Sequence, residues 1–197
     1  GCPRRAERRL RRVLDLQYPR DLVMIGAVFG VAAFAWAGWG QENPPGHVAW
    51  RVVLGGLSVA GLVLAALSIP IAIRHWRTPT AIDPGGTAFR VYLIVFWLEV
   101  IVAAVLAVVA ARAGRPDLVA PLILAVVGVH FFALAVVFQQ PVLHVAAAVL
   151  TMIAILAALL RVEGLSPSFW CAILGAPVFL AIGGWCLAVG KAVLGAA

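Results

Sequence analysis

The sequence contains six long runs of almost purely apolar residues, separated by short polar connections. The runs lie at residues 22–40, 50–73, 91–111, 118–138, 142–160 and 169–189. Each is close to the ~20 residues with which an α-helix crosses the hydrocarbon core of a bilayer. Hydrophobic residues make up 64% of the 197-residue chain and charged residues only 12%, whereas about a quarter of the residues in soluble domains are charged. The sequence therefore predicts an all-α fold, a polytopic transmembrane helical bundle of about six spans.

The connections between the runs carry residues that end helices. Paired prolines occur in "GQENPPGH", and charges are mixed with glycine and proline in "RHWRTPTAIDPGG", "ARAGRPD" and "RVEGLSP". The weakest break is "QQP", so we expect the fourth and fifth spans to form a tight helical hairpin. A second interpretation merges or shortens one span. In either case, residues 21–197 form one transmembrane domain.

Residues 1–20 are predicted to form a basic amphipathic juxtamembrane segment, because seven of the fifteen basic residues lie there. Apolar residues at helical spacing would let this helix lie on the membrane interface with its arginines in water. A solvated tail is the alternative. Nucleic acid is not expected as a partner, because no aromatic-interleaved patch accompanies the charge. The expected partners are membrane lipids, with anionic headgroups at the inner leaflet bound by six arginines: Arg4, Arg5, Arg8, Arg9, Arg11 and Arg12.

The distribution of basic residues predicts the orientation in the membrane. Six spans place both termini on one side, and if that side is cytoplasmic, eleven basic residues lie inside and four outside. This distribution follows the positive-inside rule. Arginine supplies all the basic residues except Lys191, a bias typical of GC-rich bacterial genomes. We therefore expect a multi-pass protein of the bacterial cytoplasmic (inner) membrane with both termini in the cytoplasm.

Glycines recur at spacings that allow helices to approach closely. Gly26 and Gly30 form a G-x-x-x-G pair in the first span, and further glycines lie in the second and sixth. Small residues of this kind bring helix backbones together in lipid, where the hydrophobic effect does not drive association. Packing within one bundle and dimerisation explain the motif equally well, so a homo-oligomer stays among the expected partners.

Glu99 is the sharpest chemical feature, because it is a carboxyl group inside the third apolar run. A charged carboxylate facing lipid at that depth costs several kcal/mol, so the group should be neutral, paired or turned toward an internal cavity. His130 in the fourth run lies at a similar expected depth, and consecutive spans are often neighbours in space. We therefore expect a Glu99–His130 hydrogen bond in which the two groups titrate together.

Other polar residues in the spans suggest a funnel that narrows toward this pair. Tyr92 lies seven residues before Glu99, and His144 and Thr151 are likewise seven apart, so each pair shares a helix face. Gln139 and Gln140 occupy the turn on the inner side. The alternative is structural, because single polar residues in helical bundles often form interhelical hydrogen bonds. The transport or proton-binding candidates are Glu99, His130, His144, Tyr92, Thr151 and Gln140.

No cofactor is expected, and no metal site. His130 and His144 differ too much in expected depth to face each other across one haem iron, and no HExxH or closely spaced His/Cys motif is present. Catalytic serine chemistry also lacks a candidate, so an intramembrane enzyme is the least favoured class. Cys171 and Cys186 share one predicted helix at about 22 Å, which is beyond disulfide reach. Modification of Cys2 is left open.

The segment "GVHFF", with Gly128 and His130, followed by the turn "FQQP", resembles a family of small, uncharacterised bacterial multipass inner-membrane proteins with G-x-H-F on a late span. The resemblance covers about thirty-five residues and implies a helical bundle in a bacterial inner membrane. It draws attention to His130 and brings no assigned activity.

Two functions are compatible with these features. The first is a small transporter or channel, with or without proton coupling, in which Glu99 and His130 form the protonatable centre, since histidine ordinarily titrates near neutral pH. The second is a non-transporting membrane interaction or lipid-associating protein, in which the buried polar residues only fix the packing.

Overall fold

The computed structural model describes residues 15–160 and 163–196, and this part of the chain is all-helical, without strands. Six of its helices are long and apolar enough to cross a membrane, as the sequence predicts. A short 3-10 turn, η1 (Pro116–Leu118), leads into the fourth of them. The six are α2 (Pro19–Trp39), α3 (Val48–Arg74), α4 (Thr87–Arg112), α5 (Val119–Val137), α6 (Val142–Leu159) and α7 (Pro167–Gly195).

 The tight connection between α5 and α6 (Val142–Leu159) spans only residues 138–141, which confirms the predicted hairpin.

The helix ends differ from the predicted spans at a few places. Helix α4 begins at Thr87 instead of residue 91, and α7 continues to Gly195 instead of residue 189. The sequence prediction ended each span where the apolar run ended, whereas a helix continues through polar residues at the membrane surface as long as its backbone hydrogen bonds are made. The predicted amphipathic helix and its arginines lie mostly in residues 1–14, outside the described residues, and α2 itself begins at Pro19.

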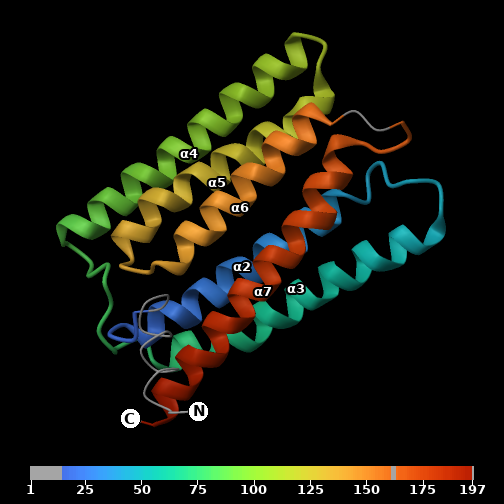
Figure 1. Ribbon diagram of the computed structural model, residues 1–197. Helices are drawn as coiled ribbons and strands as arrows, with labels where there is room; N and C mark the ends of the chain where they lie inside the picture. Colours follow the sequence, from blue (N-terminus) through green and yellow to red (C-terminus); the bar gives the residue numbers. More distant parts are fainter. Residues whose placement is uncertain (1–14, 161–162, 197) are drawn as a thin grey trace, which may run out of the picture.

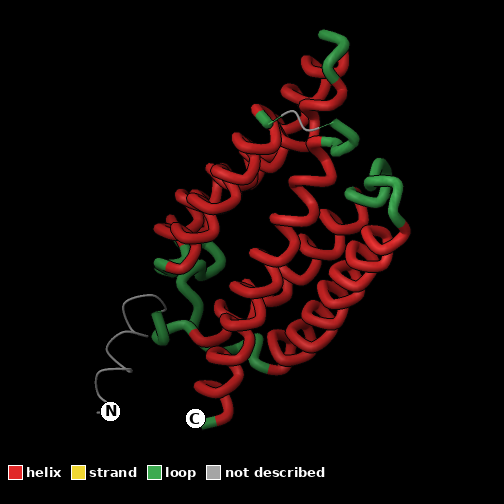
Figure 2. The backbone as a smooth tube through the Cα atoms, turned by 45° about the vertical axis from the view of Figure 1, so that its right-hand side comes forward, coloured by secondary structure: helices red, strands yellow, loops and turns green. Residues whose placement is uncertain are grey.

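The six helices form two groups of three (Figures 1 and 2). Helices α2, α3 and α7 pack together, and so do α4, α5 and α6. The chain builds α2 and α3, crosses to the other group for three helices, and returns with α7, which packs against both α5 and α6. The last helix therefore joins the two groups.

Glycines allow the α2, α3 and α7 backbones to approach one another. A Cβ atom placed on Gly30 would lie 2.5 Å from the Ala65 nitrogen of α3, and one on Gly61 would lie 2.5 Å from the Phe34 nitrogen of α2. A Cβ atom on Gly26 would lie 3.1 Å from the carbonyl oxygen of Gly183 in α7. Both glycines of the G-x-x-x-G pair are thus used for packing within the chain.

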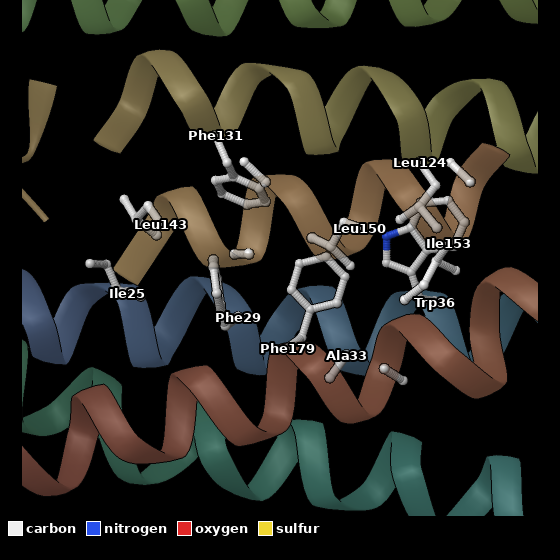
Figure 3. Close-up of a cluster of buried hydrophobic side chains, with 14 of the residues drawn as sticks. Ile25, Phe29, Ala33, Trp36, Leu124, Phe131, Leu143, Leu150, Ile153 and Phe179 are labelled. Carbon is white, nitrogen blue, oxygen red and sulfur yellow. The ribbon is translucent and has the colours of Figure 1, made fainter. Parts of the chain in front are cut away.

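A cluster of aromatic rings fills the space where the two groups meet (Figure 3). The ring of Phe29 from α2 lies 5.2 Å from the ring of Phe131 from α5 and 5.2 Å from that of Phe179 from α7, measured between centroids. All three side chains are buried, and their edge-to-face arrangement is a favourable one for aromatic pairs. These rings therefore pack α2, α5 and α7 against one another.

We call the end of the bundle where α2 begins and α7 ends the termini end. A Cβ atom placed on Gly190 near the end of α7 would lie 2.8 Å from the carbonyl oxygen of Pro19, so these two segments are in contact. The α5–α6 turn lies at the same end, because the side chain of Gln140 bonds to the backbone of Asp15. The α3–α4 loop also lies there, since its Thr80 bonds to Asp21.

Helix α4 lies at the edge of the molecule, and its main partner is α5. Ala110 is its only buried residue, although the helix has 26 residues, all of them described. The side of α4 turned away from α5 is largely exposed, and part of it lines the space between α4 and α2. This peripheral position leaves room for a cavity between the two helix groups.

Candidate functional site

Glu99 occupies the middle of α4. It lies twelve residues after Thr87, the first residue of the 26-residue helix, and therefore about 18 Å along the helix axis. A carboxyl group at this depth is far from either membrane surface, where it would be hydrated. Its side chain is 16% exposed, so it is neither sealed in the bundle nor turned fully toward lipid.

His130 of α5 supplies the partner that the sequence predicts for this carboxyl group. Its Nδ1 atom lies 3.1 Å from Oε1 of Glu99, and its side chain is 13% exposed. Nδ1 also lies 3.0 Å from the carbonyl oxygen of Val127, one helical turn earlier. The imidazole also packs against the ring of Phe131, with 4.6 Å between the two ring centroids.

The two neighbours of Nδ1 determine which nitrogen carries the proton when the carboxyl group is ionised. A carbonyl oxygen and a carboxylate oxygen can only accept hydrogen bonds, so Nδ1 must be the donor. The neutral ring is then the Nδ1–H tautomer, and a second proton is gained or lost at Nε2. With that proton the pair has no net charge, and without it the pair has a charge of −1.

The pair borders a cavity of about 980 Å³ between the two helix groups. Pockets that hold drug-sized ligands have volumes of about 300–1,000 Å³, so this cavity lies at the upper end of that range. Its walls come mainly from α2, the α3–α4 loop, α4 and α5, with single residues from α6 and α7. Most of the lining is apolar or aromatic, and the inner wall includes the buried rings of Phe29, Phe131 and Phe179.

At the termini end, the cavity is lined by Arg20, Asp21 and the α3–α4 loop, and we call this part of the cavity its mouth. Asp21 is buried and accepts hydrogen bonds from the Thr80 hydroxyl at 2.8 Å and from the Ala81 backbone nitrogen at 2.8 Å. Arg20 donates from Nη1 to the Trp76 carbonyl oxygen at 2.6 Å, and its guanidinium lies over the Trp76 ring. Its Nε lies 3.6 Å from Asp21 Oδ1. These contacts attach the α3–α4 loop to the start of α2.

A row of aromatic rings follows α4 from the mouth toward Glu99. Phe89, Tyr92 and Phe96, which we call the aromatic row, lie three and four residues apart, and Glu99 follows three residues later. This spacing places all four on one helix face. The Tyr92 ring lies 6.3 Å from that of Phe89 and 6.4 Å from that of Phe96, with interplanar angles of 29° and 25°. All four residues line the cavity.

The structure brings together only part of the predicted funnel. Glu99, His130 and Tyr92 line the cavity, and the other three candidates, His144, Thr151 and Gln140, are not among its described lining residues. His144 is exposed on α6, with its ring 6.0 Å from that of Phe132. The structure therefore places these three residues outside the cavity that Glu99, His130 and Tyr92 line, and Thr151 of α6 packs against Gly128 of α5 instead of facing α4.

Thr151 and Gln140 contact other parts of the chain instead. Thr151 lies against Gly128 of α5. A Cβ atom placed on Gly128 would contact both the hydroxyl group and the backbone nitrogen of Thr151. The Oγ1 atom of Thr151 is buried and has no hydrogen-bond partner. Gln140 is fully buried, accepts a hydrogen bond from the Asp15 nitrogen at 3.0 Å and donates one to the Asp15 carbonyl oxygen at 2.9 Å. The neighbouring Gln139 is exposed and adopts a φ of 54° in the α5–α6 turn.

The sequence reasoning missed the mouth residues and two rings of the aromatic row. The spacing of Phe89, Tyr92, Phe96 and Glu99 was a signal that could have identified that row, since it marks one face of a helix. No comparable signal was available for Asp21 and Thr80, which are 59 residues apart in the sequence.

Comparisons with known proteins add no assignment. No family model, no curated protein and no solved structure matches this chain. The function therefore has to be inferred from the geometry of the cavity and the chemistry of its residues.

Proposed function

We propose that this integral membrane protein is a small transporter that takes an organic molecule into the cavity and couples its passage to protonation of the Glu99–His130 pair. One observation carries the proposal: the pair borders a cavity of about 980 Å³. A pair that only fixed the packing of α4 against α5 would need no such space beside it. Ionisable groups inside a membrane ordinarily face a pathway or a cavity when they take part in transport.

The shape of the cavity supports a ligand that arrives from the membrane or from its surface. At the termini end, the lining includes exposed residues of the α3–α4 loop, such as Arg77 and Asp83. On the lipid-facing side it includes Val28 of α2, which is 55% exposed, and Phe96 of α4, which is 40% exposed. An amphipathic molecule could therefore enter between α2 and α4 without crossing the headgroup region through water.

The charges of the chain support one orientation of the cavity. The positive-inside rule favours a cytoplasmic termini end, so the mouth would open toward the cytoplasmic side of a bacterial inner membrane. The chain offers a direct check, because Asp83 lies at the termini end and Glu163 lies in the α6–α7 loop at the opposite end. In intact cells, a membrane-impermeant maleimide should label Glu163→Cys and spare Asp83→Cys. The reverse labelling would invert the orientation.

Transport can be tested in proteoliposomes with an imposed pH gradient. Three solutes of different charge serve as probes: ethidium as a cation, anilinonaphthalene sulfonate as an anion and chloramphenicol as an uncharged molecule. We expect at least one of them to be moved faster than in protein-free liposomes, at a rate that depends on the pH gradient. Glu99→Gln and His130→Gln should abolish the dependence on the gradient, because each removes a member of the protonatable pair. His144→Gln is the matched control and should leave it intact, since His144 is exposed outside the cavity.

Two results would reject this function. If none of the three solutes moves faster than in protein-free liposomes, the non-transporting alternative replaces it. If Glu99→Gln transports with an unchanged dependence on the pH gradient, the pair is structural. The elution profile and thermal unfolding of each variant in detergent show whether it is folded, and Gln at position 99 can still accept the bond from His130 Nδ1.

A further inference from the structure

Aromatic side chains are concentrated around the cavity. Its lining includes both tyrosines and six of the nine phenylalanines of the chain. The aromatic row on α4 leads from the mouth to Glu99, and the buried rings of Phe29, Phe131 and Phe179 form the wall beyond it. The faces of such rings carry partial negative charge and attract cations, most strongly where water is excluded.

Acidic and basic side chains are equal in number at the mouth of the cavity, whereas the carboxyl group of Glu99 lies farther along α4. At the mouth, Arg20 lies beside Asp21, and the exposed Arg77 and Asp83 also carry opposite charges. Deeper in the cavity the titratable residues are Glu99 with His130 and the phenol of Tyr92. From α6 and α7, the described lining residues are the apolar Leu143 and Phe179. The deep part therefore has a charge of −1 whenever His130 is neutral and Glu99 ionised.

These two features together select a class of ligand. A carboxylate at the end of the aromatic row repels an anion, and it adds no charge–charge attraction for an uncharged molecule. A small hydrated cation would lose its hydration shell against apolar walls that offer few oxygen ligands in return. A large cation with delocalised or shielded charge loses little hydration and gains contacts with both the rings and the carboxylate.

We infer that the cavity binds a lipophilic organic cation, which enters along the aromatic row of Phe89, Tyr92 and Phe96 and replaces a proton at the Glu99–His130 pair. This inference rests on the proposed function and names its substrate class. The charge balance is one for one: a monovalent cation binds beside Glu99, His130 loses its second proton from Nε2, and that proton leaves to the solvent. The net charge of the site is zero before and after the exchange.

Two probe ions of the same shape and opposite charge test the inference. Tetraphenylphosphonium and tetraphenylborate are titrated into the purified full chain in lipid nanodiscs, with empty nanodiscs as the reference. We expect the phosphonium to bind with an affinity that rises with pH, and to release protons detected by a pH dye in weak buffer. Glu99→Gln should weaken its binding by about tenfold or more, because a carboxylate in a low-dielectric site contributes strongly to cation binding. Glu163→Gln is the control, since it removes the same charge at an exposed position outside the cavity.

A second pair of variants tests the aromatic row without touching the carboxylate. Tyr92→Leu removes the central ring of the row, and we expect about tenfold weaker phosphonium binding. Phe132→Leu removes a ring from the exposed side of α5, outside the described lining of the cavity, and should bind like the unmodified chain. If Glu99→Gln does not fold, the comparison of Tyr92→Leu with Phe132→Leu still tests whether the cavity binds the phosphonium.

The outcomes separate this inference from the proposed function. Tetraphenylborate binding as tightly as the phosphonium, or phosphonium binding that is unchanged by both Glu99→Gln and Tyr92→Leu, overturns the substrate class. Gradient-driven movement of the anion or of the uncharged probe in proteoliposomes would then still support transport. If the phosphonium binds with proton release but no probe is transported, the cation-binding site is supported and the transport function is rejected.

Discussion

The hydroxyl group of Thr80 donates a 2.8 Å hydrogen bond to the carboxylate of Asp21, which joins the α3–α4 loop to the start of α2. Asp21 is only 1% exposed, and its other oxygen accepts from the Ala81 nitrogen. The α3–α4 loop supplies much of the mouth of the cavity, so this contact holds one rim of the site in place.

Asp21→Asn should loosen this rim. The amide oxygen can replace only one of the two accepting oxygens, and the Nε of Arg20 would lose the carboxylate beside it. A buried group left without its partner costs about 1–3 kcal/mol, so we expect lower stability by that amount. The measurement is thermal unfolding in detergent. Asp83→Asn removes an exposed charge from the same loop and should leave the unfolding midpoint unchanged. If the two variants were equally stable, the contact of Asp21 with the α3–α4 loop would not stabilise the protein.

Gly128→Ala should separate α5 from α6. The added Cβ would lie 2.7 Å from the Thr151 nitrogen and closer still to its hydroxyl, and backbone atoms cannot rotate away. Overpacking of this kind typically costs about 1–3 kcal/mol, which thermal unfolding would detect. Gly184→Ala is the matched control in α7, where nothing lies within 4 Å of the new Cβ. We expect Gly184→Ala to keep the stability of the unmodified chain. If Gly184→Ala unfolded at a lower temperature than Gly128→Ala, the close packing at Gly128 would not explain the result.

Thr151→Val should leave both stability and transport intact. Valine has nearly the shape of threonine and removes the buried Oγ1, which has no hydrogen-bond partner. Replacing an unpartnered polar atom by an apolar one is neutral or stabilising. Thermal unfolding and the proteoliposome assay together check this. Loss of pH-dependent transport in this variant would show that Thr151 belongs to the proton pathway.

The sequence was sufficient to predict the six spans and the Glu99–His130 contact. The spans follow from the length of the apolar runs, and the contact follows from the cost of an unpaired carboxyl group together with the adjacency of consecutive helices. The interactions that determine the spans and this contact are local in the sequence or obligatory in lipid.

The cavity and its mouth could not be predicted in the same way. Their positions depend on α7, which returns to pack against α2 and also against α5 and α6. A seven-residue spacing identifies a helix face but does not say which neighbour that face meets, and for this reason Thr151 was assigned to the funnel although it packs against Gly128. The contact between Gln140 and Asp15 joins residues 125 apart, and no sequence pattern marks it.

Gln140→Glu should release the chain that precedes α2 from the α5–α6 turn. Gln140 both accepts from the Asp15 nitrogen and donates to the Asp15 carbonyl oxygen, and an ionised glutamate can do only the first. Its second oxygen would face the carbonyl oxygen, so we expect a loss of about 1–3 kcal/mol in stability. Hydrogen exchange at the Asp15 amide should rise together with a fall in the thermal unfolding midpoint. Gln139→Glu makes the same chemical change at the adjacent exposed position and should alter neither quantity. If both variants behave alike, the buried amide does not hold the two segments together.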